Sequence, residues 1–320
     1  MFFTNKRHSN LIHLILAAML VVSLTGCGSG GGSAKTLGEF EVNQNSSSSR
    51  DNKKNVLSPA APGAKKDGCD VFMLDYSNTS EGYIVARYTG NSPKVKFQLT
   101  GNDQTTYTYN LPTNVDTVVP LSAGNGSYTV AVFESIGGDQ YATAFSTSIN
   151  VNMQNEFGPF LYPNQYVNFT ANSAAINQAE KLASGATSDL EVIAKIYAYV
   201  SENVVYDKEE AENVQSGYLP DVDEVLSTKK GICFDYAALM ASMLRSQNIP
   251  TRLEIGYAKD AYHAWISVYT KDTGWIDKLI EFNGTEWSLM DPTLAANSAD
   301  IKKMKDFIGD GTSYVTKYKY

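Results

Sequence analysis

The stretch that decides the fold of this chain is residues 229–250, KKGICFDYAALMASMLRSQNIP. Its middle is almost continuously apolar or aromatic, and a helix that is apolar on all sides is buried on all sides. Gly231 allows a tight turn into this helix, whereas Asn248 suits a left-handed cap and Pro250 forbids continuation. The sequence therefore predicts a central buried helix over residues 233–244, with a cysteine in its first turn.

Cys233 is a candidate nucleophile because of the place that the helix gives it. The positive end of the helix dipole and the free N–H groups there favour a thiolate, and Lys229 and Lys230 add positive charge nearby. The alternative is that Cys233 is a small buried hydrophobic residue, as many free cysteines are. The sequence downstream has to decide between these two roles.

Two later motifs favour the catalytic role. Residues 262–265, Tyr-His-Ala-Trp, open a strand-like run, and residues 287–293, WSLMDPT, close another. A cysteine on a helix, then a histidine on the next strands, then an acid is the order that a thiol nucleophile requires. His263 is the only histidine after the first 26 residues, which excludes a three-histidine metal site. Asp291 precedes a proline, so its alternative role is that of a turn former.

This combination resembles the transglutaminase-like domain family over residues 186–293. The family pattern is a glycine-rich approach to the cysteine, then His-Ala-Trp, then Trp-x-x-x-Asp-Pro-Thr, and all three occur here in that order. The resemblance implies a papain-like α+β fold with a Cys233–His263–Asp291 triad. It also implies that Tyr206, in a Tyr-Asp pair like the one that ends a similar helix in the family, is a candidate oxyanion donor.

The expected chemistry follows from the residue types. Cys233 attacks a carbonyl carbon as a thiolate, and its backbone N–H stabilises the oxyanion. His263 holds the thiolate as an imidazolium and later donates a proton to the leaving amine, while Asp291 orients the ring. Attack of water on the resulting thioester gives hydrolysis, and attack of an amine gives cross-linking.

The front of the chain has the features of a lipoprotein signal peptide, residues 1–26. Lys6 and Arg7 form a basic start, and residues 11–24 are largely apolar but shorter than the roughly 20 residues that span a membrane. The run ends in Leu-Thr-Gly-Cys, which resembles the lipobox of bacterial lipoproteins, so we expect Cys27 to be lipidated. An ordinary cleaved signal peptide or a short transmembrane anchor is the alternative.

Residues 27–67 are rich in Gly, Ser, Asn and Ala and have few bulky apolar residues, which predicts a flexible tether. If Cys27 carries lipid, Cys69 and Cys233 are the only cysteines left. A disulfide between them would consume the nucleophile, so we expect two free thiols.

Residues 68–153 read as about seven short strands separated by turn signals, which is typical of an immunoglobulin- or fibronectin-like β-sandwich. We see no catalytic constellation in this region. Its tyrosines are either a carbohydrate- or protein-binding face or, more simply, ordinary strand residues: Tyr83, Tyr88, Tyr107, Tyr109, Tyr128 and Tyr141.

Residues 154–320 are expected to form the transglutaminase-like domain. Ser188 begins a capping box for an amphipathic helix that runs to residue 204. Residues 251–257 and 263–269 alternate as strands, and Asn283-Gly284 marks a hairpin. We expect His263 and Asp291 to lie on neighbouring antiparallel strands, with the Cys233 helix across the face of the sheet.

The function that these observations favour is that of a lipid-anchored, extracytoplasmic cysteine enzyme. It would act on amide bonds in proteins or cell-wall peptides, by hydrolysis rather than cross-linking, and without a cofactor. The alternative is a surface adhesion or assembly protein that uses the transglutaminase-like domain only as a binding scaffold. The net charge of −8 argues against a nucleic-acid partner.

Overall fold

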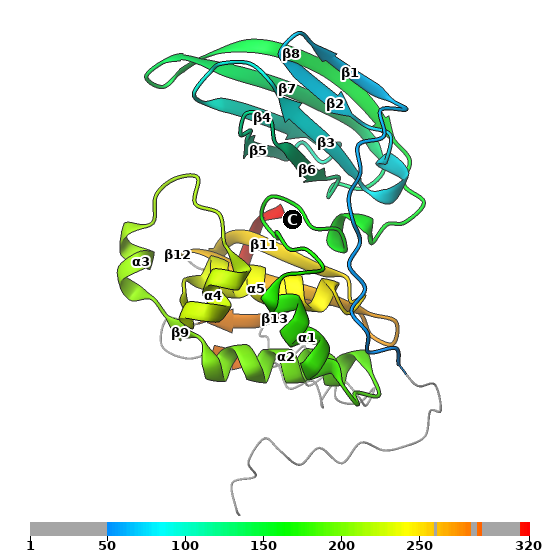
Figure 1. Ribbon diagram of the computed structural model, residues 1–320, viewed down its shortest axis with the longest axis vertical. Coiled ribbons are helices and arrows are strands. Elements are labelled where there is room, and N and C mark those ends of the chain that lie inside the picture. The colour runs from blue at the N-terminus through cyan, green and yellow to red at the C-terminus, as the bar shows by residue number, and fades with distance from the viewer. Residues whose placement is uncertain (1–49, 259–260, 283–286, 290–313) are drawn as a thin grey trace, which may run out of the picture. The chain divides into compact units, whose positions relative to one another are not determined.

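The computed structural model describes residues 50–258, 261–282, 287–289 and 314–320. The predicted signal peptide and Cys27 lie outside these residues, and so does Asp291. From Ser48 to Tyr320 the chain forms one compact unit, whose β-rich first part and mixed second part are seen in Figure 1.

The β-rich part consists of two antiparallel four-stranded sheets. One has the order β1-β2-β3-β6 and the other β5-β4-β7-β8. Phe72 of β2 contacts Phe97 of β4 and Phe145 of β8 at ring-centroid distances of 6.1 and 5.3 Å, so the two sheets share a core. The strands are β1 (Lys66–Cys69), β2 (Phe72–Asp75), β3 (Tyr83–Tyr88), β4 (Val95–Thr100), β5 (Thr106–Asn110), β6 (Asp116–Pro120), β7 (Gly126–Gly137) and β8 (Gln140–Val151).

The seven strands expected from the alternating pattern correspond to β2–β8. β1 was not expected, because Lys66–Cys69 has no apolar alternation and is exposed at every position. It is held instead by its backbone pairing with β2. Two short 3-10 helices are η1 (Thr79–Glu81), between β2 and β3, and η2 (Gly158–Phe160), after β8.

Residues 50–65 differ from the tether that we expected. Arg50 donates to Asp189 at 2.7 Å and to the carbonyl of Gln247 at 2.6 Å, and the amide of Asn55 donates to the carbonyl of Ser246 at 2.7 Å. The amide of Gly63 donates to Asp75 at 2.6 Å. This segment is therefore fixed by polar contacts, which a prediction based on missing apolar residues does not detect.

The second part is built around α5 (Cys233–Arg245), the helix predicted from the opening stretch. All residues from Asp235 to Arg245 are buried, and Asn248 has the expected left-handed φ of 59°. Helices α1, α2 and α4 pack against α5. The other elements before α5 are α1 (Ala174–Ala183), α2 (Asp189–Asn203), β9 (Val205–Tyr206), α3 (Lys208–Asn213), α4 (Val222–Thr228) and β10 (Lys230–Gly231).

The N-cap predicted for α2 is confirmed at Ser188, but the reciprocal bond of the capping box goes to Thr187, one residue before the cap. The Ser188 side chain accepts from the amide of Glu191 at 3.2 Å, and Glu191 accepts from the amide of Thr187 at 2.9 Å. Among the helices of the described residues, none combines the length and the hydropathy needed to cross a membrane.

A five-stranded sheet of order β14-β13-β12-β11-β15 covers α5 (Figure 1). It contains β11 (Thr251–Ala258), β12 (Ala261–Thr270), β13 (Gly274–Phe282), β14 (Trp287–Leu289) and β15 (Tyr314–Lys319). The prediction that the His263 strand and the strand leading to residue 291 are neighbours is wrong, because β13 pairs with both β12 and β14 and lies between them. β15 was not predicted.

Three of the β-domain tyrosines contact the second part of the chain, and the first is Tyr83, whose ring centroid lies 4.6 Å from that of Tyr162. Tyr107 packs edge-on against Tyr320 at 5.5 Å, and Tyr109 packs against Tyr166 at 5.5 Å. The Tyr166 hydroxyl also donates to the carbonyl of Thr108 at 3.1 Å. These tyrosines are therefore neither ordinary strand residues nor an open binding face.

Arg245 closes α5 and is almost fully buried, at 1% exposure. Its guanidinium donates to the carbonyls of Thr251, Tyr162 and Tyr320, with distances from 2.7 to 3.1 Å. A planar fork with five donors suits this task, because a single cation serves three chain segments. Without it, the carbonyls of Thr251, Tyr162 and Tyr320 would each lose a donor, and among the described residues that of Tyr320 would keep only the amide of Leu253.

We expect Arg245→Met to lower the free energy of unfolding by about 3 kcal/mol or more, because each buried polar group left without a partner costs about 1–3 kcal/mol. Urea unfolding measures this. Arg87→Met is the matched control, since Arg87 pairs with Asp116 on the surface, where such pairs contribute about 0–1 kcal/mol. Equal effects of the two substitutions would contradict the role assigned to Arg245.

Candidate active site

Cys233 is the first residue of α5, as the sequence predicted. The preceding Ile232 is extended, and its amide donates to the Asp235 carboxylate at 2.8 Å. A Cβ on Gly231 would lie 2.7 Å from the Cβ of Asp235. The glycine is thus needed for this close approach and not for a left-handed turn, since the positive φ, 57°, falls on Lys229.

The sulfur of Cys233 lies among backbone donors. The N–H groups of Ala264 and Phe234 and its own N–H interact with Sγ. Burial has the larger effect and raises the pKa of Cys233, while these N–H groups lower it and the Asp235 carboxylate raises it further. These effects disfavour the resting thiolate expected at this helix terminus, because desolvation is the largest of them.

His263 lies on β12, one residue before the Ala264 amide that reaches Cys233. Ala264 and Ile266 are in the apolar core with α5, as expected for the opposite face of this strand. The His263 ring instead stacks near Trp265, with ring centroids 6.5 Å apart. Burial lowers the pKa of His263, so neutral imidazole is favoured.

Two features of the His263 ring bear on the triad. Its Nε2 is buried and has no hydrogen-bond partner in the described part of the chain. Among the hydrogen bonds of the described residues, none joins the His263 ring to Cys233. The structure thus brings the two residues to one place in the fold without forming the expected imidazolium–thiolate pair.

Tyr206 reaches the same place through β9. This strand pairs in parallel with β10, which sets Tyr206 beside Gly231, two residues before Cys233. Burial raises the pKa of Tyr206, and the Cys233 N–H, which donates to the tyrosine oxygen, partly offsets this effect. The two expected oxyanion donors are therefore in contact with each other.

Asp235 and Tyr218 belong to the site and were not predicted. Asp235 is fully buried, and the Tyr218 hydroxyl donates to it at 2.7 Å. Burial raises the pKa of this carboxyl to about 6, against the lowering effect of its two hydrogen bonds. A carboxylate at the third position of an otherwise apolar helix was a signal for a cap that the sequence analysis could have used.

We expect Asp235→Asn to lower the pKa of Cys233, because it removes a negative charge that raises this pKa. The amide oxygen can still accept from the Ile232 amide, so the helix start is preserved. The measurement is the rate of iodoacetamide labelling against pH in a Cys69→Ser background, where the inflection should move to lower pH.

Tyr218→Phe is the control for this experiment, because it removes a hydrogen bond to Asp235 and keeps the carboxylate. It should leave the inflection at or above that of the parent. An unchanged inflection in Asp235→Asn would show that the carboxylate does not act on the thiol.

The chain has similarity to a curated protein and to solved structures. UPF0252 protein MJ1282 of Methanocaldococcus jannaschii is 28% identical over 143 residues, which are 40% of this chain and 38% of that relative. A candidate cysteine protease from Cytophaga hutchinsonii is a structural neighbour with 12% identity and a TM-score of 0.35, over 74% of this chain and 83% of the other. Red sea bream transglutaminase is another structural neighbour, with 17% identity and a TM-score of 0.26. The match covers 66% of this chain and 48% of the transglutaminase chain.

The chain thus spans 38% of the length of its curated relative. The model of the Transglutaminase-like superfamily matches residues 176–278. This match includes Cys233, His263 and Tyr206 but ends before Asp291. Residues 176–278 are therefore a transglutaminase-like domain.

Proposed function

We propose that this protein is a cysteine-dependent hydrolase of amide bonds in proteins or cell-wall peptides. The observation that carries the proposal is the setting of Cys233 at the first turn of a buried helix, with the Ala264 amide, next to His263, close enough to lower the pKa of its thiol. His263 precedes Ala264 on β12, and its buried Nε2 has no partner among the residues that the structure describes.

The pKa directions at the site favour a neutral thiol and a neutral imidazole before substrate binds. In the reaction, His263 removes the proton from Cys233 as the sulfur bonds to the substrate carbonyl carbon. The same proton then passes to the leaving amine, and a thioester remains. Water, deprotonated by His263, attacks the thioester and releases the acid and the free thiol.

Asp291 would complete the triad at the free Nε2 of His263. A carboxylate there would accept the N–H and stabilise the positive ring that forms when His263 takes the proton. Catalytic hydrogen bonds are often long or misaligned before substrate binds. The absence of a hydrogen bond between Cys233 and His263 is therefore compatible with this reaction.

The oxyanion would be stabilised by the Cys233 N–H and by Tyr206. Since the N–H now points to the tyrosine oxygen, the substrate oxygen must replace that oxygen as the acceptor. The Tyr206 hydroxyl can then turn its own proton to the oxyanion.

A binding scaffold without catalysis is the second candidate. The raised pKa of Cys233 and the missing hydrogen bond to His263 favour it. Such a protein would need none of the proton transfers described above, so activity measurements separate the two candidates.

We expect the full chain to hydrolyse members of a peptide library, and Cys233→Ala to abolish this activity. Cys69→Ala is the matched control and should keep it, because Cys69 is exposed on β1. Mass spectrometry of the products, with and without an added amine, compares the amount of hydrolysed peptide with the amount of peptide transferred to the amine. We expect the hydrolysed product to dominate.

Asp291→Asn extends this test to the acid. In triads of this kind the loss of the orienting carboxylate costs about 10⁴ in kcat, and we expect a loss of orders of magnitude with an unchanged melting temperature. Activity within about twofold of the parent would assign Asp291 to a turn. A Cys233→Ala variant as active as the parent would end the enzyme proposal in favour of the scaffold.

We further propose that the protein is an extracytoplasmic lipoprotein. Lipidation of Cys27 would anchor it to the membrane, with the stretch up to Arg50 as the tether. The β-rich part would be an immunoglobulin- or fibronectin-like sandwich. Its support is the pair of four-stranded antiparallel sheets with a common core.

We expect Cys27→Ser to release the protein from the membrane fraction, because one lipid-bearing cysteine would be its anchor. Cell fractionation followed by immunoblotting measures this, with Cys69→Ser as the control that stays membrane-bound. Retention of both variants in the membrane would show that another element holds the protein there.

A further inference from the structure

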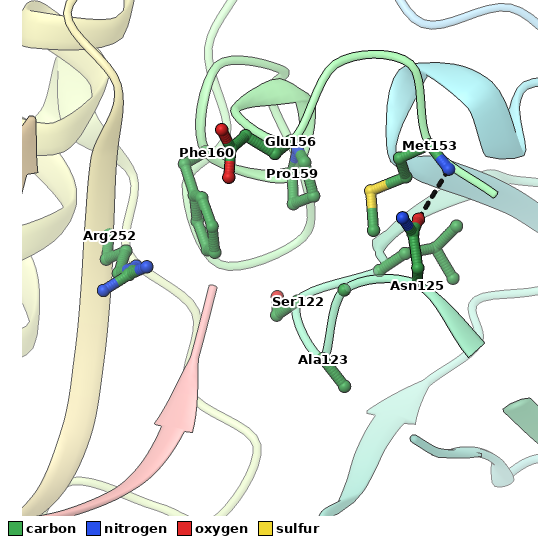
Figure 2. A pocket seen from close by; sticks show the side chains of 10 residues that line it. Ser122, Ala123, Asn125, Met153, Glu156, Pro159, Phe160 and Arg252 are labelled. Atoms are coloured by element: carbon green, nitrogen blue, oxygen red, sulfur yellow. Dashed lines mark hydrogen bonds between the residues drawn. The ribbon is translucent and has the colours of Figure 1, made fainter. Parts of the chain in front are cut away.

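A cavity of about 290 Å³ lies away from Cys233, where the turn between β6 and β7 meets the segment after β8 and the start of β11 (Figure 2). The β6–β7 turn contributes residues 121–125, including Ser122. The segment after β8 contributes Met153, Glu156, Pro159 and Phe160, and β11 contributes Arg252. All of these residues belong to the same compact unit.

Arg252 is held in a fixed position by aromatic rings. Its guanidinium carbon lies 3.5 Å from the ring centroid of Trp275 and 5.0 Å from that of Phe160. Figure 2 shows it reaching from β11 toward the Phe160 ring. Stacking of this kind orients a guanidinium while it leaves the N–H edges free.

Within the described residues, none of the guanidinium N–H groups of Arg252 forms a hydrogen bond, and its Nε is buried there without a partner. The contact to Asp277 is long, at 4.0 Å, and Asp277 is 64% exposed. Ser122 Oγ, which also lines the cavity, is likewise buried without a partner in the described part of the chain. Buried donors are normally paired, so these two groups require an acceptor.

The charges around Arg252 decide which acceptor fits. Glu254, Asp277 and Glu156 all lie close enough to act on it electrostatically. One cation surrounded by three carboxylates does not attract an anion. Glu254 already accepts from Trp265 and from Thr316, whereas Glu156 lines the cavity. The cavity thus has hydrogen-bond donors, Arg252 and Ser122, that suit a neutral acceptor. It also has one carboxylate, that of Glu156, that suits a neutral donor.

We propose that this cavity binds a neutral secondary amide. The amide oxygen accepts from Arg252, with Ser122 as a second donor, and the amide N–H donates to Glu156. The alkyl group on the amide carbon packs against Phe160 and Pro159. The volume is at the lower limit of ligand pockets, which are about 300–1,000 Å³, so it accommodates a single amide-bearing unit. An N-acetylated sugar and a short peptide both carry this group.

Ligand-observed NMR on the full chain tests the proposal with four probes. N-acetylglucosamine and N-acetylalanine methylamide carry the amide, glucose lacks it, and acetate is an anion. We expect saturable binding of at least one amide probe and no binding of glucose or acetate. The amide probe that binds identifies the source, sugar or peptide.

Substitutions then locate the binding. We expect Glu156→Ala to lower the affinity for the amide probe about tenfold, because the probe loses a hydrogen bond to a charged group. Ser122→Ala should lower this affinity less, and the surface control Glu202→Ala should leave it unchanged. Arg252→Met should abolish binding, but the Glu156 and Ser122 variants decide the matter if it does not fold.

Cys233→Ser should bind the probe like the parent, so this test is independent of the proposed catalysis. Three outcomes overturn the proposal. They are no binding of either amide probe, binding of acetate at least as tight as that of the amides, and equal affinity of the parent and the Glu156→Ala and Ser122→Ala variants.

Discussion

The complete burial of α5 is the constraint on which the rest of the second part depends. A helix that is covered on every side needs partners on every side, and α1, α2, α4 and the sheet supply them. Its polar groups must then be satisfied inside the protein. Arg245 does this at one end by donating to three segments, and Asp235 does it at the other end by accepting from Ile232 and Tyr218.

The same burial sets the chemistry of the site. It raises the pKa of Cys233 and lowers that of His263, so it disfavours charge on both members of the proposed catalytic pair. The helix N-terminus is worth at most about 2 kcal/mol to a partly buried anion, and here desolvation is the larger effect. A neutral thiol and a neutral imidazole are therefore favoured at rest, and in the proposed reaction the proton moves during attack.

Much of the fold could be predicted because it rests on local patterns: the apolar run of α5, the cap at Ser188 and the alternation of β2–β8. The parts that could not be predicted rest on contacts between distant residues. β15 pairs with β11, where a Cβ on Gly256 would lie 2.0 Å from the carbonyl oxygen of Val315. A glycine within a strand was a signal for such an approach, but it does not name the partner. At the site, Cys233 was located by its helix, whereas the orientation of His263 depends on its packing against Trp265.

Tyrosine side chains connect the β-rich part directly to the second part of the chain. Tyr107 and Tyr109 of β5 both pack against Tyr320, which also accepts from Arg245. The amide of Lys319, on β15, donates to the Tyr107 hydroxyl at 3.4 Å. The sheet that carries His263 is thus joined at its β15 edge to the β-rich part through aromatic side chains. A spacer connected only by a linker would have no such contacts, so the two parts are built to act as one body, and the cavity at Arg252 lies where they meet.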